Sequence, residues 1–279
     1  MVSPFSPTLF IASRTPLASL LTTLTRLLTT TTPPPPLYLD LEGINLSRRG
    51  TVSVLTLHTP ALLPAVYLID IHRLQSRAFT TPCPLTGATL ASILASPAAP
   101  KVFFDVRNDS DALFAHYGVR LRGVEDVQLM ENAVRWSEPR GGPGGVERGW
   151  LVGLDRCVQD SVGTKGGGLL TGEEEAEWRA VKEGGRMLFV PGRGGGWGVF
   201  EERPMRGELM TYCVNDVVLL PLLRERYMGK LSTGWKRRVE RETRKRVKES
   251  QSPGYEPDGE GKGLGPWRQS RGRQEQDRS

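Results

Sequence analysis

The chain has 279 residues, 38% of them apolar, so it is long enough to bury one sizeable hydrophobic core. Its 37 Lys and Arg residues outnumber 31 Asp and Glu residues, and the formal net charge of +6 favours an anionic partner. The three scattered cysteines argue against a disulfide framework or a zinc site and favour a reducing compartment. No apolar run reaches the roughly 18 residues that a membrane-spanning helix needs.

The first 36 residues contain two arginines, no acidic residue and many Ser and Thr residues, a composition typical of an organelle transit peptide. The same stretch also fits a folded start. Phe10 and Ile11 predict a short strand, and leucines at helical spacing between residues 17 and 28 predict an amphipathic helix. We therefore expect a nuclear or cytoplasmic protein, with mitochondrial targeting as the alternative. The Thr- and Pro-rich residues 29–36 predict an extended connector.

Three runs typical of β-strands follow this connector, at residues 37–43, 51–57 and 65–71. Turn-forming residues 47–50 separate the first two runs, which predicts a hairpin. The third run continues the same pattern. We expect the three to form an antiparallel meander.

From residue 90 the apolar spacing alternates between helix and strand. Apolar residues 90, 93 and 94 predict a helix, residues 101–104 a buried strand, residues 111–117 a helix that ends at Gly118, and residues 124–129 a short strand. The fold class predicted from this order is α/β: a mixed sheet, antiparallel at first and parallel later, with helices on its faces.

Beyond residue 140 the predicted helices are separated by glycine-rich segments. Glycine-rich patches at residues 141–145, 166–168 and 192–196 predict flexible surface loops, and none ends like a phosphate-binding loop. Helical fragments are expected at residues 151–158 and 173–181, and one strong helix at residues 205–224. Residues 235–249 carry eight Lys or Arg against three Glu, and the polar residues 250–279 are expected to be mobile.

Two acidic residues, Asp40 and Glu42, lie two positions apart on the first predicted core strand. Side chains at this spacing leave the same face of a strand, so the two carboxylates would repel each other unless a cation joined them. Oxygen ligands of this kind suit Mg²⁺ or Mn²⁺. The alternative is a polar, solvent-facing side of an edge strand.

A second acidic group stands where the buried strand at residues 101–104 meets the next helix. Acids in this position lie near the end of the sheet, where ligands gather in α/β folds. Asp109 and Asp111 are the candidate ligands. The alternative is that Asn108, Asp109 or Ser110 caps the helix.

The third group, Tyr212 and Asp216, is spaced four apart on a predicted helix, so the two side chains share one face. An ordinary hydrogen-bonded pair on a core helix is the alternative to a catalytic role.

Together the three groups resemble the DEDDy exonucleases, the family of RNase D and the Werner-syndrome exonuclease domain, which has a ribonuclease H-like fold. The family's Asp-x-Glu motif matches Asp40 and Glu42, and its Tyr-x-x-x-Asp motif matches Tyr212 and Asp216. In the family's second motif a Leu or Phe follows the liganding Asp by four residues and a Gly by nine, so Leu113 and Gly118 identify Asp109 as the ligand. Asp111 would then interact with the positive end of the helix or face solvent. The segment around Asp126 resembles the family's Asp-Thr-Gln, although that Asp is not usually a metal ligand.

The resemblance implies two-metal hydrolysis of phosphodiesters from a free 3′ end of RNA or DNA. Asp40, Glu42, Asp109 and Asp216 would hold two Mg²⁺ or Mn²⁺ ions ~4 Å apart, and Tyr212 would position or help deprotonate the attacking water. Residues 8–228 would form the exonuclease domain. Residues 229–279 would form a basic helix and flexible tail that neutralise the nucleic-acid backbone.

The sequence departs from RNase D in two ways. The Gly-rich stretch between the second and third motifs looks expanded, and the chain has no room after Tyr227 for the helical substrate-binding domain that RNase D carries. Two alternatives to an exonuclease stay open: a nucleic-acid-binding or scaffold protein that uses the same fold, and a phosphodiesterase acting on small nucleotides. The sequence predicts no particular protein partner.

Overall fold

The computed structural model describes residues 7–62, 66–138, 147–162, 170–259 and 261–267. At its centre lies a six-stranded sheet of order β1-β4-β3-β2-β5-β6. The strands are β1 (Thr8–Ile11), β2 (Leu37–Glu42), β3 (Val54–His58), β4 (Val66–Asp70), β5 (Lys101–Phe103) and β6 (Val124–Asp126). Strands β2, β3 and β4 are antiparallel to their neighbours within the meander, whereas β1, β5 and β6 add in parallel. The predicted mixed sheet is confirmed.

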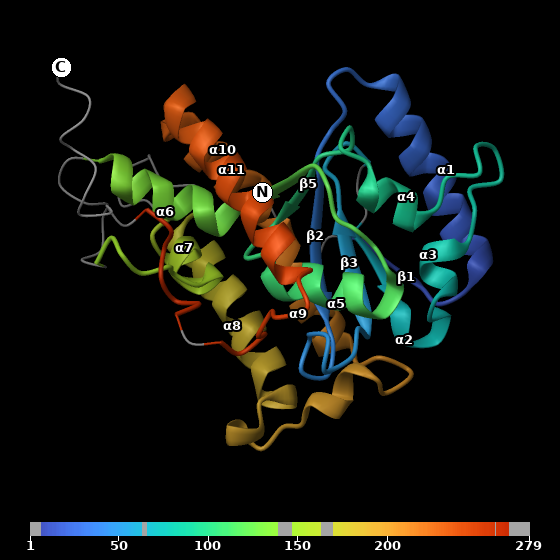
Figure 1. Cartoon of the computed structure of the whole chain (residues 1–279). Coiled ribbons are helices and arrows are strands. Elements are labelled where there is room, and N and C mark those ends of the chain that lie inside the picture. Colours follow the sequence, from blue (N-terminus) through green and yellow to red (C-terminus); the bar gives the residue numbers. More distant parts are fainter. Residues whose placement is uncertain (1–6, 63–65, 139–146, 163–169, 260, 268–279) are drawn as a thin grey trace.

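Helices cover both faces of the sheet (Figure 1). One face carries α1 (Arg14–Thr30), α2 (Ile71–Leu74), α3 (Arg77–Thr80), α4 (Leu90–Ala95) and α5 (Arg107–Tyr117). The other carries α6 (Val127–Ser137), α7 (Leu154–Gln159), α8 (Gly172–Phe189), α9 (Gly207–Val218) and α10 (Leu220–Lys230), with short 3₁₀ turns at Pro191–Arg193 and Trp197–Phe200. The last helix, α11 (Thr233–Ser250), contacts edge strand β6 together with α5 and α6.

The alternation of residues along β2 decides which face receives the acids. Leu37, Leu39 and Leu41 are buried in the core that includes α1 and α5. Because successive side chains of a strand point to opposite faces, Asp40 and Glu42 point toward the helical layer of α8 and α9. Thus the leucine stripe that anchors the strand also orients its carboxylates.

Several predicted elements differ in extent from the observed ones, and two of the differences change the order of elements. Residues 127–129, predicted as strand, begin helix α6, because the carboxylate of Asp126 accepts the N–H groups of Gln128 and Leu129 and so caps a helix there. The single helix predicted over residues 205–224 is divided at Leu219. Pro221 stands in the first turn of α10, where its missing N–H can be tolerated, whereas an unbroken helix would need that donor.

Helix α11 is packed into the molecule on one side. Val239 and Val247 are buried, and the Arg246 guanidinium donates hydrogen bonds to Asp126 (2.8 Å) and Gln128 (3.1 Å). Beyond it, the carbonyl groups of Ser252 and Pro253 accept hydrogen bonds from Arg48. The domain boundary after residue 228 stays a prediction, and residues 268–279 lie outside the described part.

Of the three glycine-rich patches, those at residues 141–145 and 166–168 lie outside the described residues. The third overlaps a 3₁₀ turn and is exposed apart from the half-buried Gly195, where an added Cβ would lie 2.5 Å from the backbone of Leu188. No helix within the described ranges is long and apolar enough to cross a membrane.

Candidate active site

Three of the predicted carboxylates meet between β2 and α9. Asp40 and Glu42 come from the strand and Asp216 from the helix, and one oxygen of each lies within 4.8 Å of the others. The helix is brought to this point by its apolar residues, because Val214 and Val217 are buried in the core that this face of the sheet shares with α6 and α10. The sequence spacing therefore identified side chains that the fold places together.

Asp109 lies beside the three-carboxylate group, in the first turn of α5. It is 6% exposed, and its Oδ1 accepts the backbone N–H of Leu41 at 3.1 Å. Leu41 stands between Asp40 and Glu42 on β2, so this hydrogen bond holds the fourth carboxylate next to the strand that carries the first two.

Asp111 has a different environment from the one expected, since it neither faces solvent nor serves the helix end. Its side chain is fully buried and accepts a hydrogen bond from Arg48 Nε at 2.6 Å and from the Arg48 backbone N–H at 2.8 Å. Both oxygens are therefore engaged in fixing the loop between β2 and β3. Two positions along a helix rotate a side chain by about 200°, which explains why the two acids point to different partners.

A tight turn between β5 and α5 delivers Asp109. Asp105 adopts a left-handed backbone conformation with φ of 61°. The Asp126 carboxylate accepts the N–H groups of Asp105 (3.2 Å) and Val106 (3.3 Å), and Arg246 compensates its charge. Helix α5 begins at Arg107 with Val106 as N-cap and no side-chain cap, so no acid of this segment is used for N-capping.

Tyr212 lies one turn before Asp216 and is 8% exposed. Phe189 packs against its ring edge-on, with centroids 5.1 Å apart. Helix α8 approaches the same ring at Gly185, where an added Cβ would lie 2.3 Å from Tyr212 Cδ2. Only glycine allows this contact, which packs the Tyr212 ring of α9 directly against α8.

The side chain of Lys182 on α8 lies among these carboxylates, and the sequence did not predict this. Its ammonium forms a salt bridge with Asp216 and lies 3.8 Å from the centroid of the Tyr212 ring. The side chain is 4% exposed. A lysine on a charged helix 30 residues before the tyrosine carries no recognisable sequence signal, and only the packing of α8 on α9 brings it here.

Burial, and after it the repulsion between carboxylates, governs the electrostatics of the site. Burial, followed by repulsion from Asp216, raises the pKa of Glu42 to about 8, and the same two causes raise the pKa of Asp40 well above its usual range. Burial also raises the pKa of Asp109 to about 8. For Tyr212, burial and the neighbouring carboxylates raise the phenol pKa, so this hydroxyl stays protonated.

The donor set fits a hard divalent cation. All the candidate ligand atoms are carboxylate oxygens, and once deprotonated they would carry more negative charge than the ammonium of Lys182 balances. A cation bound there would favour the deprotonated carboxylates and so lower these raised pKa values.

Comparison with known proteins assigns this arrangement to a family. A family model described as 3′-5′ exonuclease matches residues 18–231, which include all four carboxylates and Tyr212. The chain belongs to the 3′-5′ exonuclease family. Among curated proteins, none matches the chain significantly.

Solved structures of exonucleases share the fold. Trypanosoma brucei RNase D in complex with GMP is 21% identical, with a TM-score of 0.63 over 89% of this chain and 65% of that chain. Escherichia coli RNase D is 18% identical, with a TM-score of 0.55 over 88% of this chain and 51% of that one. The catalytic core of RRP6 from T. brucei is 14% identical, with a TM-score of 0.54 over 87% and 52%. The chain thus spans between half and two thirds of these exonucleases.

Proposed function

We propose that this exonuclease-family chain removes nucleotides from the 3′ end of a nucleic acid by metal-dependent hydrolysis. The observation that carries the proposal is the convergence of Asp40, Glu42 and Asp216 on one point, with Asp109 hydrogen-bonded beside them. The same four acids are those that the family resemblance identifies as the metal ligands.

Asp40, Glu42, Asp109 and Asp216 would hold Mg²⁺ or Mn²⁺. When bound, such ions lower the pKa of a coordinated water and stabilise charge on the departing 3′ oxygen. The protein's part is to keep the carboxylates in place: the leucine stripe fixes β2, and the Asp126 carboxylate fixes the turn before Asp109.

Tyr212 would orient the attacking water by a hydrogen bond. Its raised pKa keeps the hydroxyl protonated, so it can donate to an oxygen but is a poor base. The close contacts with Gly185 and Phe189 hold the ring in one orientation, which such a role requires.

RNA with a free 3′ end is the proposed substrate to test first. T. brucei RNase D, which shares the fold, has been solved in complex with RNA U12. That likeness suggests RNA, and the positive net charge of this chain suits either nucleic acid.

The deciding experiment uses a 5′-labelled single-stranded RNA, the matching DNA and a circular RNA, each with Mn²⁺, Mg²⁺ or EDTA. The proposal predicts a ladder of products shortened one nucleotide at a time from the 3′ end, only with metal and only on linear substrates. The Asp40→Asn variant is the control for a contaminating nuclease. Cleavage of the circle, or equal cleavage by the variant, would contradict the proposal.

Tyr212→Phe tests the role of the hydroxyl. We expect turnover to fall by more than about tenfold while Mn²⁺ affinity stays nearly unchanged, because the hydroxyl acts on water and not on the ion. Single-turnover kinetics and calorimetric titration with Mn²⁺ measure the two quantities. Equal rates for the two proteins would remove Tyr212 from the mechanism.

One observation favours a second candidate, a nucleic-acid-binding protein of this family with little catalytic activity. Lys182 already places a cation on Asp216, where it would compete with a metal ion. In that case the ladder would be absent with every metal, while metal-independent binding of the same RNA would persist.

A further inference from the structure

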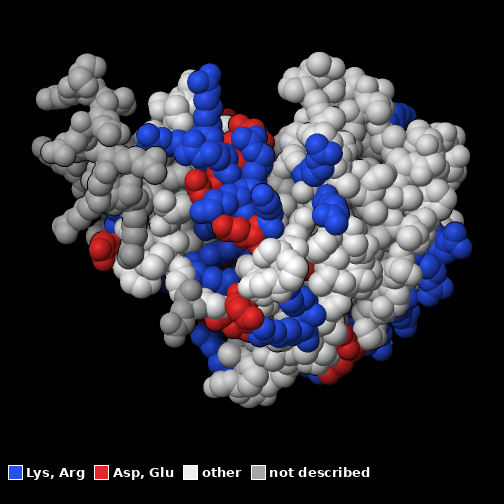
Figure 2. Space-filling view, viewed as in Figure 1, with Lys and Arg blue, Asp and Glu red and all other residues white. Residues whose placement is uncertain are grey.

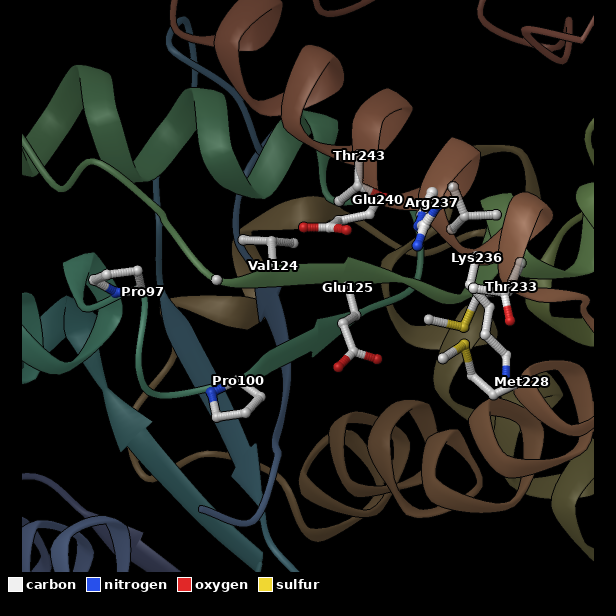
Figure 3. Close-up of a pocket in the computed structure, with 13 residues that line it drawn as sticks. Pro97, Pro100, Val124, Glu125, Met228, Thr233, Lys236, Arg237, Glu240 and Thr243 are labelled. Carbon is white, nitrogen blue, oxygen red and sulfur yellow. The ribbon is translucent and has the colours of Figure 1, made fainter. Parts of the chain in front are cut away.

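A groove runs between helix α11 and the edge strand β6. It consists of two adjoining hollows of about 380 Å³ and 640 Å³, which share Pro97, Gly123, Val124 and Glu240 in their linings. Figure 3 shows the smaller hollow, with α11 along one side and β6 with Val124 and Glu125 along the other. The floor of this part includes the apolar side chains of Met130, Met228 and Val239.

The larger hollow is strongly cationic. Arg120 and Arg122 line it from the segment before β6, and Arg244 and Lys248 line it from α11, against the single acid Glu240. All four cations are exposed. Figure 2 shows Lys and Arg gathered over α11 in this part of the surface.

Helical spacing aligns the cations of α11 along the groove. Arg237 lines the smaller hollow, and Arg244 and Lys248 follow it by seven and eleven residues on the larger one. These positions return to nearly the same face of a helix and extend over roughly 16 Å. The groove therefore presents a line of positive charge, the pattern that a phosphate backbone requires.

The groove lies at the opposite end of the sheet from the carboxylates. Val124 stands in register with Lys101, and Lys101 with Leu37 at the start of β2. Asp40 and Glu42 follow three and five residues later, which places them roughly 10 and 16 Å further along the strand direction. A ligand that occupies both places must be longer than a terminal nucleotide.

We propose that this groove is a second binding site for single-stranded nucleic acid, which anchors the strand upstream of the 3′ end. The cations would contact phosphates, and the apolar floor would receive sugar or base faces. The inference rests on the proposed function for the polarity of the strand.

The test is binding without cleavage, by fluorescence anisotropy in EDTA with labelled RNAs of about 4 and about 16 nucleotides. The groove variant carries Arg120→Ala, Arg244→Ala and Lys248→Ala. The control variant carries Arg14→Ala, Arg26→Ala and Arg73→Ala, three exposed arginines of α1 and α2 with the same change in net charge. Thermal unfolding checks that both variants remain folded.

We expect the groove variant to lose about tenfold in affinity for the longer RNA, to keep its affinity for the shorter one, and to show a shallower salt dependence. The control variant should bind both as the wild type does. Equal losses in the two variants, or equal losses for both RNA lengths, would overturn the inference. So would a polyglutamate peptide that binds the groove while RNA does not, which would indicate an acidic protein partner.

The outcome also separates this inference from the proposed function. If short RNA gives the ladder and the groove variant binds RNA as the wild type does, the proposed exonuclease activity is supported and the proposed binding site in the groove is contradicted. If the groove binds RNA in a length-dependent way and no RNA is cleaved, the binding site is supported and the exonuclease activity is contradicted.

Discussion

Asp109 and Asp111 lie two residues apart on α5, yet they have different partners and therefore different roles. The first accepts a hydrogen bond from the β2 backbone beside the cluster of carboxylates, and the second, itself fully buried, forms a salt bridge with the half-buried Arg48. A carboxylate whose charge is neutralised by an arginine in this way has a structural role. One left uncompensated beside three others is a candidate ligand.

The two asparagine variants should therefore fail in different ways. Asp109→Asn should abolish metal-dependent cleavage with little loss of stability, because a raised pKa shows that its charge is unfavourable in the metal-free fold. Asp111→Asn should cost about 3 kcal/mol of stability, since it leaves the Arg48 guanidinium without its counter-charge, while the folded fraction still cleaves. Denaturant unfolding and cleavage per folded molecule distinguish them. The reverse pattern would reassign the second motif to Asp111.

Lys182 acts as the counter-ion of the site when no metal is bound, so its removal should affect the metal-free protein most. In EDTA, Lys182→Met should lower the melting temperature, because Asp216 loses its salt bridge with the ammonium. Metal binding should tighten by about tenfold, because no protein cation has to be displaced. Lys182→Arg is the matched control that keeps the charge. Weaker Mn²⁺ binding by Lys182→Met, measured by calorimetry, would instead show that the lysine supports the loaded site.

The sequence predicted a set of site residues on the basis of spacing within single elements. Asp40 and Glu42 share a face because side chains repeat every two residues along a strand. Tyr212 and Asp216 share a face because side chains repeat about every four residues along a helix. Lys182 could not be predicted in this way, since its place depends on the packing of one helix against another. The metal-ligand roles of these acids stay predictions.

At the scale of elements, α11 differs from a solvated basic tail in having two unlike sides. Its outward side carries the cations of the groove, whereas its inward side buries Val239 and Val247 and pairs Arg246 with Asp126. It also covers the open edge of β6, an edge that would otherwise expose unpaired backbone groups.

A substitution at each side of α11 tests this division. Arg246→Met should destabilise the protein by about 3 kcal/mol, because it leaves a fully buried Asp126 carboxylate without its cation. Arg241→Met, an exposed position on the same helix with a weak surface pair, should stay within about 0.5 kcal/mol of the wild type. Urea unfolding measures both. Equal stabilities would mean that the backbone N–H groups around Asp126 suffice to hold its charge.

Most strands were predictable because alternation and turn residues are local signals, and the antiparallel meander followed from them. The start of α6 was not, because the helix depends on a cap made by Asp126, whose own orientation is fixed by the turn before α5 and by Arg246 of α11. Nor was the break between α9 and α10 expected, although Pro221 marks it in the sequence. In both places the prediction was based on the spacing of apolar residues. The capping residue or the proline determines where the helix begins or ends.

The molecule as a whole combines a net charge of +6 with acidic side chains gathered at one site. The positive charge favours approach of a polyanion, and the acidic side chains, once deprotonated, would repel it unless cations were bound. Metal binding should therefore couple stability, pH and affinity for nucleic acid in one equilibrium.

That coupling gives a pH dependence whose sign can be worked out. Glu42 and Asp109 have pKa values of about 8 in the fold, above their ordinary values of 4.5 and 3.8, so the folded metal-free protein binds more protons than the unfolded chain. Their contribution to stability is complete below about pH 4 and is lost as pH rises through about 8. In EDTA the melting temperature should fall over this window.

Divalent metal should oppose this fall, because it binds the deprotonated carboxylates and stabilises only the folded state. The rise in melting temperature caused by Mg²⁺ should therefore be larger at about pH 8.5 than at about pH 5.5. Asp40→Asn, which removes one proposed ligand, should shrink the rise at both pH values. Thermal unfolding with Mg²⁺ or EDTA across this range makes the measurement. A rise that is independent of pH would show that the ion binds elsewhere than at the carboxylates with raised pKa.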